Sequence, residues 1–347
     1  MPDKVRVGIV GLGFGQRVLL PAFRADPRCE VVGLCGARSQ HTREVAGGLG
    51  IPAYDTWQAL VDDPLIDAVA IATPSPSHRA IATAALNRKK HVFCEKPLAD
   101  SLDAARQMTI AAAAAGTANM VDFELPEGAE WQRARDVVAS GALGRLRFVS
   151  VTWHQQTYAN RLQLTNWKTR ASDGGGALNE FVSHCFHYLE WLLGPILLVW
   201  SAPIDDGERA ADRDTVVVLS LRLLAGATVS VSVCTDAIGG DGHAIRVYGE
   251  SGTLALVNPT ADHACGFALY LGSREGARLE RESVAGAVID TAADGRIDAV
   301  GRLIDRFATW ALDGRASGPS FDDGLRVQML LDAAWRSRRE GGWCRVG

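Results

Sequence analysis

The sequence predicts an α/β domain with a parallel sheet, followed by an α+β domain with a large, open and mainly antiparallel sheet. Its length of 347 residues suggests two domains. In the first part, short runs that are apolar throughout alternate with helical patterns, which is typical of a parallel sheet covered on both faces. In the second part, strand-like runs are joined by short turns, which favours antiparallel pairing. We therefore expect domains at residues 1–122 and 123–347.

The elements of the first domain follow from its apolar runs. The expected strands are Val5–Val10, Val31–Cys35, Ala68–Ile71, His91–Cys94 and a last one near Ala118–Asp122. The expected helices are one that ends at Ala25, then Thr42–Leu49, Ser77–Asn87 and Ser101–Ala115.

The second domain is expected to bind substrate and to mediate oligomerisation. Its expected strands are Leu146–Gln156, Asp214–Arg222, Ala227–Thr235, His243–Gly249 and Gly252–Val257. Its expected helices are Leu178–Leu193, Arg296–Ala311 and Asp322–Glu340. So few helices would leave one face of the sheet exposed unless a second subunit covered it, so we expect a homodimer or a homotetramer.

Composition and charge exclude several classes of partner. Charged residues make up 22% of the chain and the formal net charge is −4, without the basic surplus that nucleic-acid binding requires. The longest apolar stretch, Tyr188 to Trp200, is interrupted by Glu190 and is too short to span a bilayer. Seven cysteines without a Cys-x-x-Cys pair argue against disulfides and structural zinc, and no metal site is expected. No signal peptide fits before the first strand, so we expect a cytoplasmic protein.

A glycine-rich turn follows the first strand and opens a helix: Gly11-Leu-Gly-Phe-Gly15. In this context Gly11 permits a tight turn, Gly13 lets the backbone approach a pyrophosphate, and the helix N-terminus supplies donors. The turn therefore predicts a Rossmann domain that binds a dinucleotide. The third glycine comes one position earlier than in the usual G-x-G-x-x-G pattern, and Gln16 takes its place. A glycine-rich turn without a ligand is the alternative.

The end of the second strand bears on the choice between NAD and NADP. An acidic residue there would bind the ribose 2′-hydroxyl of NAD. Glu30 stands at the wrong end of the strand, and the correct end carries Cys35-Gly-Ala-Arg38-Ser39. Arg38 and Ser39 could bind a 2′-phosphate, so NADP is preferred over NAD. If Arg38 is only a solvated loop residue, the chain would take NAD or both.

The most specific pattern covers several separate segments. It comprises Ile71-Ala-Thr-Pro74, His78, Ala84-Ala-Leu86, Lys90-His-Val-Phe-Cys-Glu-Lys-Pro-Leu98, Gly174-Gly-Gly-Ala-Leu-Asn-Glu180, His184, Trp191-Leu-Leu-Gly194, Asp323-Gly-Leu and Ala333-Ala-Trp-Arg-Ser337. With these segments the chain resembles the Gfo/Idh/MocA family over nearly its whole length. The resemblance implies an NAD(P)-dependent oxidoreductase, a dehydrogenase or reductase that acts on one hydroxyl or keto carbon of a sugar, sugar derivative or cyclitol.

The resemblance also implies a catalytic group. In the family a Lys acts with an Asp and, four residues later, a His; these positions hold Lys96, Glu180 and His184 here. Independently of the family, Lys96 follows a parallel strand, where the crevice of such a sheet binds ligands. Imidazole titrates near working pH, so His184 is the expected base and Glu180 would orient it, although Glu180 could instead contact substrate or solvent.

Two further positions depart from the family pattern. His187 stands where the family has an Asp and Val182 where it has a Gly, so the usual substrate of the family is not assumed.

The residues expected to contact the cofactor are Gly11, Gly13, Phe14, Gly15, Gln16, Arg38, Ser39, Thr73, Pro74, His78, Glu95 and Lys96. The residues expected to contact substrate are Tyr158, Trp167, Lys168, Arg170 and His184, because aromatic and basic groups suit a polyhydroxylated or anionic ligand.

Two other functions stay open at this point. One is a cofactor-binding regulator that has lost catalysis. The other is a hydrolase or lyase that uses a tightly bound nicotinamide transiently.

Overall fold

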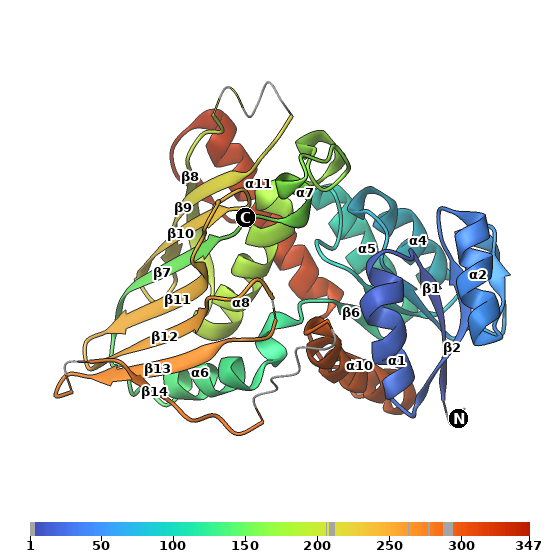
Figure 1. The fold of residues 1–347 in the computed structure, drawn as a ribbon, viewed down its shortest axis with the longest axis horizontal. Coiled ribbons are helices and arrows are strands. Elements are labelled where there is room, and N and C mark those ends of the chain that lie inside the picture. Colours follow the sequence, from blue (N-terminus) through green and yellow to red (C-terminus); the bar gives the residue numbers. More distant parts are fainter. Residues whose placement is uncertain (1–3, 206, 208–211, 263, 277, 287–293) are drawn as a thin grey trace. The chain divides into compact units, whose positions relative to one another are not determined.

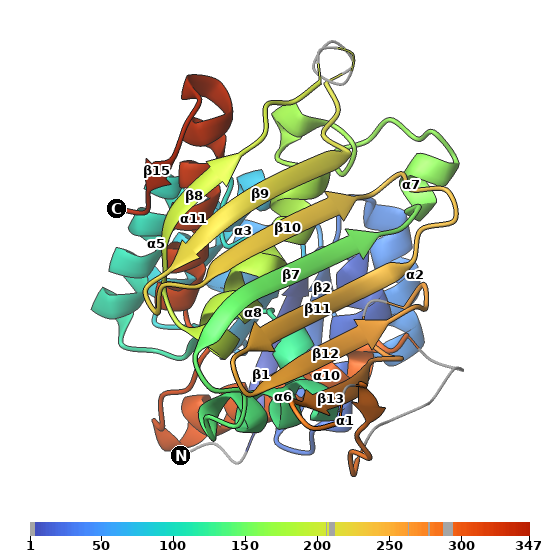
Figure 2. The ribbon, with the colours of Figure 1, turned by 90° about the vertical axis from the view of Figure 1, so that its left-hand side faces the viewer.

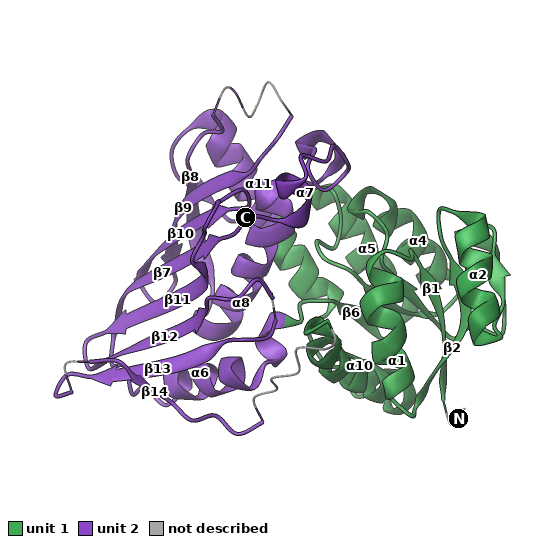
Figure 3. Cartoon of the chain, in the orientation of Figure 1, with its two compact units in different colours: residues 1–124, 292–328 green, residues 125–291, 329–347 purple. Residues whose placement is uncertain are grey.

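The computed structural model describes residues 4–205, 207, 212–262, 264–276, 278–286 and 294–347. The chain forms two compact units (Figure 3). Unit 1 contains residues 1–124 and 292–328, and unit 2 contains residues 125–291 and 329–347. Each unit has its own sheet, and each is described by itself.

Unit 1 is built on a six-stranded parallel sheet in the order β3-β2-β1-β4-β5-β6. Its strands are β1 (Val5–Val10), β2 (Cys29–Cys35), β3 (Ala53–Tyr54), β4 (Ala68–Ile71), β5 (His91–Cys94) and β6 (Asn119–Val121). The strand order reverses between β1 and β4, which lie side by side. In open α/β sheets the ligand crevice lies at this reversal, beyond the carboxyl ends of the strands. The predicted parallel α/β sheet is confirmed.

Helices cover both faces of this sheet. They are η1 (Gly15–Leu19, a π-helical turn), α1 (Leu20–Ala25), α2 (Ser39–Leu49), α3 (Trp57–Asp62), η2 (Ser75–Ser77), α4 (His78–Asn87), α5 (Leu102–Ala115) and α10 (Arg296–Asp313). α5 begins where the sequence suggests, because the hydroxyl of Ser101 accepts a hydrogen bond from the Ala104 N–H.

α10 returns from far along the sequence to complete the core of unit 1. Figure 1 shows it beside α1 and β1. The Phe307 ring packs edge-to-face against Phe23 and Phe93, with centroids 6.3 Å and 5.7 Å apart. Such aromatic pairs stabilise the core beyond what the burial of the three rings contributes by itself. The apolar face of α10 therefore packs in the core of unit 1, next to the parallel sheet.

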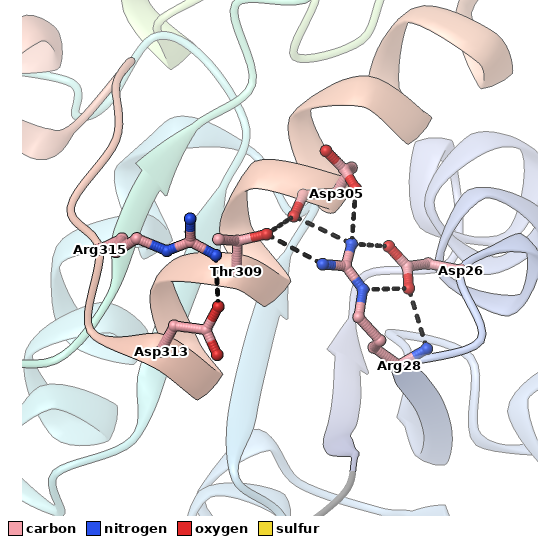
Figure 4. A network of polar contacts seen from close by, with 6 residues as sticks. All are labelled: Asp26, Arg28, Asp305, Thr309, Asp313 and Arg315. Carbon is pink, nitrogen blue, oxygen red and sulfur yellow. Dashed lines mark hydrogen bonds and ion pairs between the residues drawn. The ribbon is translucent and has the colours of Figure 1, made fainter.

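A polar network fastens the outer side of α10 to the start of β2 (Figure 4). The Arg28 guanidinium donates to both carboxylate oxygens of Asp26, at 3.0 Å and 2.6 Å. It also donates to the Thr309 hydroxyl and the Asp305 carboxylate, at 2.9 Å and 2.7 Å. One arginine thus joins segments 277 residues apart.

Unit 2 is built on a nine-stranded sheet in the order β14-β13-β12-β11-β7-β10-β9-β8-β15, seen face-on in Figure 2. All pairs are antiparallel except β7 and β10. Its strands are β7 (Leu146–His154), β8 (Ile196–Ser201), β9 (Val216–Leu223), β10 (Thr228–Cys234), β11 (Gly242–Gly249), β12 (Gly252–Asn258), β13 (Ala268–Ser273), β14 (Glu280–Arg281) and β15 (Cys344–Arg345). The predicted large and mainly antiparallel sheet is confirmed.

Helices lie on one face of this sheet. They are η3 (Leu125–Glu127), α6 (Ala129–Ala139), α7 (Tyr158–Arg161), η4 (Ala171–Asp173), η5 (Leu178–Val182), α8 (Ser183–Leu193) and the second part of α11 (Phe321–Glu340), which begins in unit 1. The alternation along β10 shows the sidedness of the sheet: Val229, Val231 and Val233 are buried, whereas Ser230 and Ser232 are half-exposed. Within the described ranges, no helix has the length and apolar composition needed to cross a membrane.

Candidate active site

The glycine turn lies at the carboxyl end of β1, beside the strand reversal. Gly11 has φ of +99°, and a Cβ there would lie 2.5 Å from the carbonyl of Ala72. Its N–H donates to the carbonyl of Cys35 at 2.8 Å, which joins the turn to the end of β2. By contrast, Gly13 is exposed and a Cβ there would meet nothing within 4 Å. The turn is thus tight at Gly11 and open at Gly13, which fits a pyrophosphate above it.

The early third glycine has a packing role. Gly15 is buried in the first turn of η1, and a Cβ there would lie 2.9 Å from Cγ2 of Ile9 on β1. Close packing of helix on strand is the usual role of the third glycine. Gln16 contacts His41 of α2 through its side-chain oxygen, 2.9 Å from Nε2. Phe14 lies under the Arg296 guanidinium, whose carbon is 5.0 Å from the ring centroid.

The end of β2 presents a cation and no carboxylate. Arg38 is exposed just before α2, and Ser39 is the first residue of that helix. Glu30 is exposed at the opposite end of the strand, paired in register with Arg6. The predicted 2′-phosphate contacts, Arg38 and Ser39, therefore lie at the edge of the sheet where Gly11 lies.

The turns after β4 and β5 are joined by a buried histidine. Nε2 of His78 lies 2.8 Å from the carbonyl oxygen of Thr73, and Nδ1 lies 3.2 Å from that of Pro97. The Thr73 hydroxyl accepts a hydrogen bond from Ser77 at 2.6 Å, while Pro74 is exposed. Because His78 is only 1% exposed, any effect on a dinucleotide would act through these turns.

A group of carboxyl groups surrounds the turn that carries Lys96. Glu95 and Lys96 follow β5, while Asp122 and Glu124 follow the neighbouring strand β6. A backbone hydrogen bond from the Asp122 N–H to the carbonyl of Cys94, at 2.8 Å, holds the ends of β5 and β6 side by side. The three carboxylic side chains are buried and Lys96 is half-buried. Asp122 and Glu124 are site residues that the sequence analysis did not single out.

Burial and mutual repulsion make these carboxyl groups hard to ionise. Burial, followed by the negative charges of Glu95 and Glu124, raises the pKa of Asp122 well above its ordinary value. Burial and the charge of Glu95 raise the pKa of Glu124 to about 7, although Lys96 and Arg296 oppose this. The Arg296 guanidinium is itself held by Asp294, at 2.7 Å and 2.6 Å. The site thus combines a lysine with a carboxyl group that titrates near neutral pH, an arrangement suited to proton transfer.

In unit 2, Glu180 and His184 lie on one continuous helix. Glu180 belongs to the π-helical turn η5 and is half-buried, whereas His184 is in the first turn of α8 and 7% exposed. The ring of His184 lies 6.1 Å from that of Trp153 on β7, and Trp153 stacks on His243 of β11 at 4.1 Å. The pattern of apolar residues predicted this helix but not its wide first turn. Val182 is fully buried and His187 half-buried.

The expected substrate segment lies between β7 and η5. Tyr158 is exposed on α7, and Trp167 is half-buried beneath the Lys168 ammonium, 5.3 Å from its ring centroid. Arg170 pairs with Asp173 at 2.5 Å. The turn at Trp167 and Lys168 packs directly against Gly175, where a Cβ would lie 2.1 Å from the Trp167 carbonyl. This close approach explains the glycine at position 175.

The structure brings the predicted cofactor residues to one edge of the sheet in unit 1, and Glu180 and His184 onto one helix in unit 2. The joint action of Lys96 and His184 stays a prediction. A signal for Asp122 and Glu124 was present in the sequence, since the strand expected near Ala118–Asp122 ends at Asp122 and Glu124 lies just beyond it.

Comparison with known proteins agrees with this architecture. Residues 5–123 match the oxidoreductase family Gfo/Idh/MocA with its NAD-binding Rossmann fold, and residues 131–255 match the C-terminal domain of the same family. The chain belongs to the Gfo/Idh/MocA oxidoreductase family.

Several relatives of this family member match over almost their whole length. The chain is 28% identical to an uncharacterized oxidoreductase of Synechocystis sp., covering 98% of this chain and 95% of the relative. It is 27% identical to a levoglucosan dehydrogenase of Pseudarthrobacter phenanthrenivorans, covering 99% and 98%. It is also 27% identical to an inositol 2-dehydrogenase of Pseudomonas fluorescens, covering 97% and 95%.

Solved structures show the same fold. A levoglucosan dehydrogenase in complex with NADH superposes with a TM-score of 0.88 at 24% identity, covering 99% of both chains. An oxidoreductase domain protein from Kribbella flavida superposes with a TM-score of 0.86 at 25% identity, covering 100% of both chains.

Proposed function

We propose that this family member is an NAD(P)-dependent dehydrogenase or reductase acting on one hydroxyl or keto carbon of a sugar, sugar derivative or cyclitol. The observation that carries the proposal is Lys96, which follows β5 at the same edge of the sheet as the glycine turn. Relatives named levoglucosan dehydrogenase, inositol 2-dehydrogenase and 1,5-anhydro-D-fructose reductase support the substrate class.

The chain's own residues would position the reactants and move one proton. A bound nicotinamide supplies the hydride acceptor or donor. His184 takes the proton from the substrate hydroxyl, or returns it in reduction, and Lys96 hydrogen-bonds the same oxygen. Glu180, one helical turn before His184, orients or polarises the imidazole. The residues Tyr158, Trp167, Lys168 and Arg170 would contact the rest of the substrate.

NADP is the preferred cofactor in this proposal. Arg38 is exposed at the end of β2, where a carboxylate would favour NAD. A solved neighbour holds NADH, and comparing NADPH with NADH binding to this chain tests the preference.

The exposed face of the sheet in unit 2 supports a homodimer or a homotetramer. Phe148, Val216, Val218 and Tyr248 are between 37% and 47% exposed, and the rings of Phe148 and Tyr248 stack at 6.1 Å. The register places all four on the face opposite the buried Val149 and Val231. The partners we propose are thus a small sugar or cyclitol and further copies of the chain.

All seven cysteines are free thiols, consistent with a cytoplasmic protein.

One assay separates this proposal from the alternatives. The purified protein is incubated with NADP⁺ or NAD⁺ and with levoglucosan, myo-inositol or 1,5-anhydroglucitol, and reduction of the cofactor is compared with consumption of the sugar. A dehydrogenase reduces one cofactor for each sugar consumed. A regulator gives no turnover, and a hydrolase or lyase consumes the sugar without net reduction; either result contradicts the proposal.

A further inference from the structure

Three consecutive residues before β9 fasten three separate parts of the segment 157–182. These residues are Asp212, Arg213 and Asp214, which we call the anchor segment. The fastened segment carries the proposed substrate residues and the start of the helix with Glu180 and His184. The contacts of the anchor segment described below lie within unit 2.

Asp214 holds the beginning of the catalytic helix. One of its carboxylate oxygens accepts a hydrogen bond from the Leu178 N–H at 2.9 Å, and its carbonyl accepts one from the Ala177 N–H at 2.6 Å. The other carboxylate oxygen accepts from Arg338 at 2.9 Å, and the side chains of this ion pair are 0% and 3% exposed. Gly176 is needed here, since a Cβ would lie 2.8 Å from the Asp214 Cβ. A carboxylate at a helix N-terminus also interacts favourably with the free N–H groups.

Arg213 holds the short helix α7. Its guanidinium donates to the side-chain oxygen of Asn160 at 2.8 Å. Asn160 is 6% exposed and its amide donates to the carbonyl of Thr235 at 2.8 Å. α7 begins at the proposed substrate residue Tyr158, so Arg213 fixes the backbone on which that ring stands.

Asp212 holds the turn η4, which follows Arg170. Its carboxylate accepts hydrogen bonds from the Ser172 N–H at 3.0 Å and from the Ser172 hydroxyl at 2.5 Å. Its carbonyl accepts one from the Ala171 N–H at 3.0 Å. Asp212 adopts φ of +50°, a left-handed conformation that few non-glycine residues adopt. Such a conformation persists where the surrounding contacts impose it.

We propose that the anchor segment is a positioning device for the active site, in which Asp212 and Arg213 set the substrate loop and Asp214 sets the catalytic helix. This inference rests on the proposed function for the roles of the two fastened parts. It predicts that the two halves of the device act on different kinetic constants. Loss of Asp212 or Arg213 raises the KM for sugar with little change in kcat, whereas loss of Asp214 lowers kcat.

The variants Asp212→Gly and Arg213→Met test the substrate loop. Glycine removes the carboxylate and still tolerates the left-handed backbone. Asp212→Gly removes the two hydrogen bonds to the carboxylate, and Arg213→Met removes the one from the guanidinium to Asn160. We therefore expect KM for the sugar with the fastest wild-type turnover to rise about tenfold. The conservative variant Asp212→Asn keeps an acceptor oxygen and should restore most of the wild-type KM. Asp136→Asn, an exposed carboxylate change on α6, is the control for charge and should leave both constants unchanged.

Hydrogen–deuterium exchange of the ligand-free protein provides a reading without turnover. We expect faster exchange of residues 157–178 in Asp212→Gly and Arg213→Met. Asp214→Asn should give faster exchange of residues 177–184, with kcat reduced about tenfold. If Asp214→Asn fails to fold, the two loop variants still decide the proposal.

Unchanged exchange in both loop variants would overturn the inference, as would an equal fall of kcat in Asp212→Gly and Asp214→Asn with unchanged KM. If the wild type turns over none of the sugars, the proposed function is wrong. The exchange measurement then still tests whether the anchor segment orders the loop and the helix.

Discussion

Replacing Glu124 by Gln should change how the stability of the protein depends on pH. Burial and the nearby Glu95 raise the pKa of Glu124 from 4.5 to about 7. Between these two values the folded protein keeps a proton that the unfolded chain has released. The free energy of unfolding therefore falls as pH rises from about 4.5 to about 7, and the loss is complete above pH 7.

The size of the effect follows from the two values. A difference from 4.5 to about 7, at roughly 1.4 kcal/mol for each pH unit, gives about 3 kcal/mol. Gln resembles the protonated form of Glu and does not titrate. The variant should therefore match the wild type near pH 4.5 and exceed its free energy of unfolding by about 3 kcal/mol at pH 8.

Urea denaturation followed by circular dichroism at pH 5 and pH 8, without cofactor, measures this difference. The control is Glu130→Gln on α6, which removes a carboxylate of the first helical turn from outside the Lys96 site. A Gln variant that is less stable than the wild type at pH 8 would refute the reasoning. That outcome would mean that attraction to Lys96 and Arg296 exceeds the cost of burying the ionised carboxylate.

The remaining predictions concern catalysis, cofactor and assembly. Lys96→Met and His184→Ala should each lower kcat by about 10²–10⁴-fold, with cofactor affinity nearly unchanged. The double variant should lose less activity than the product of the two single losses. If His184→Ala keeps a near-normal kcat at every pH, Glu180 becomes the leading candidate for the base. Arg38→Ala should weaken NADPH binding and leave NADH binding nearly unchanged. The control is Arg24→Ala, an exposed position in the last turn of α1. Equal losses of affinity for both cofactors, or tighter binding of NADH by the wild type, would contradict the proposed NADP preference. Gly11→Ala should abolish dinucleotide binding in a fluorescence titration, because its Cβ would lie 2.5 Å from Ala72. Sedimentation at micromolar concentration should show a dimer or tetramer, and a monomer would refute the proposed assembly.

Strands buried on both faces could be predicted closely from the sequence. Ala68–Ile71 and His91–Cys94 were predicted with the bounds that the structure shows, because each is an apolar run bounded by polar residues or by a turn. β8 was missed, since it continues the apolar residues of α8 after Gly194-Pro195 and has no alternation of its own. The short β3 and α3 were also missed, because two and six residues carry little periodicity.

Candidate site residues could be predicted where a local pattern, such as the end of a strand or the spacing along a helix, determines position in space. Lys96 stays a predicted site residue; besides the family resemblance, its place after a parallel strand pointed to the ligand crevice. Asp122 and Glu124 follow the next strand, but an acidic side chain in a sequence shows no sign of burial. The pairing of Asp214 with Arg338 spans 124 residues, and no local pattern indicates it.

The return of α10 to the first sheet has a consequence for synthesis of the chain. A ribosome completes the six strands of unit 1 long before it makes Phe307, which closes the aromatic cluster with Phe23 and Phe93. Until then the nascent sheet presents an apolar surface to solvent or to chaperones. A fragment that stops after Glu124 would keep this surface permanently exposed. We therefore expect unit 1 to bind a nucleotide only after nearly the whole polypeptide has left the ribosome.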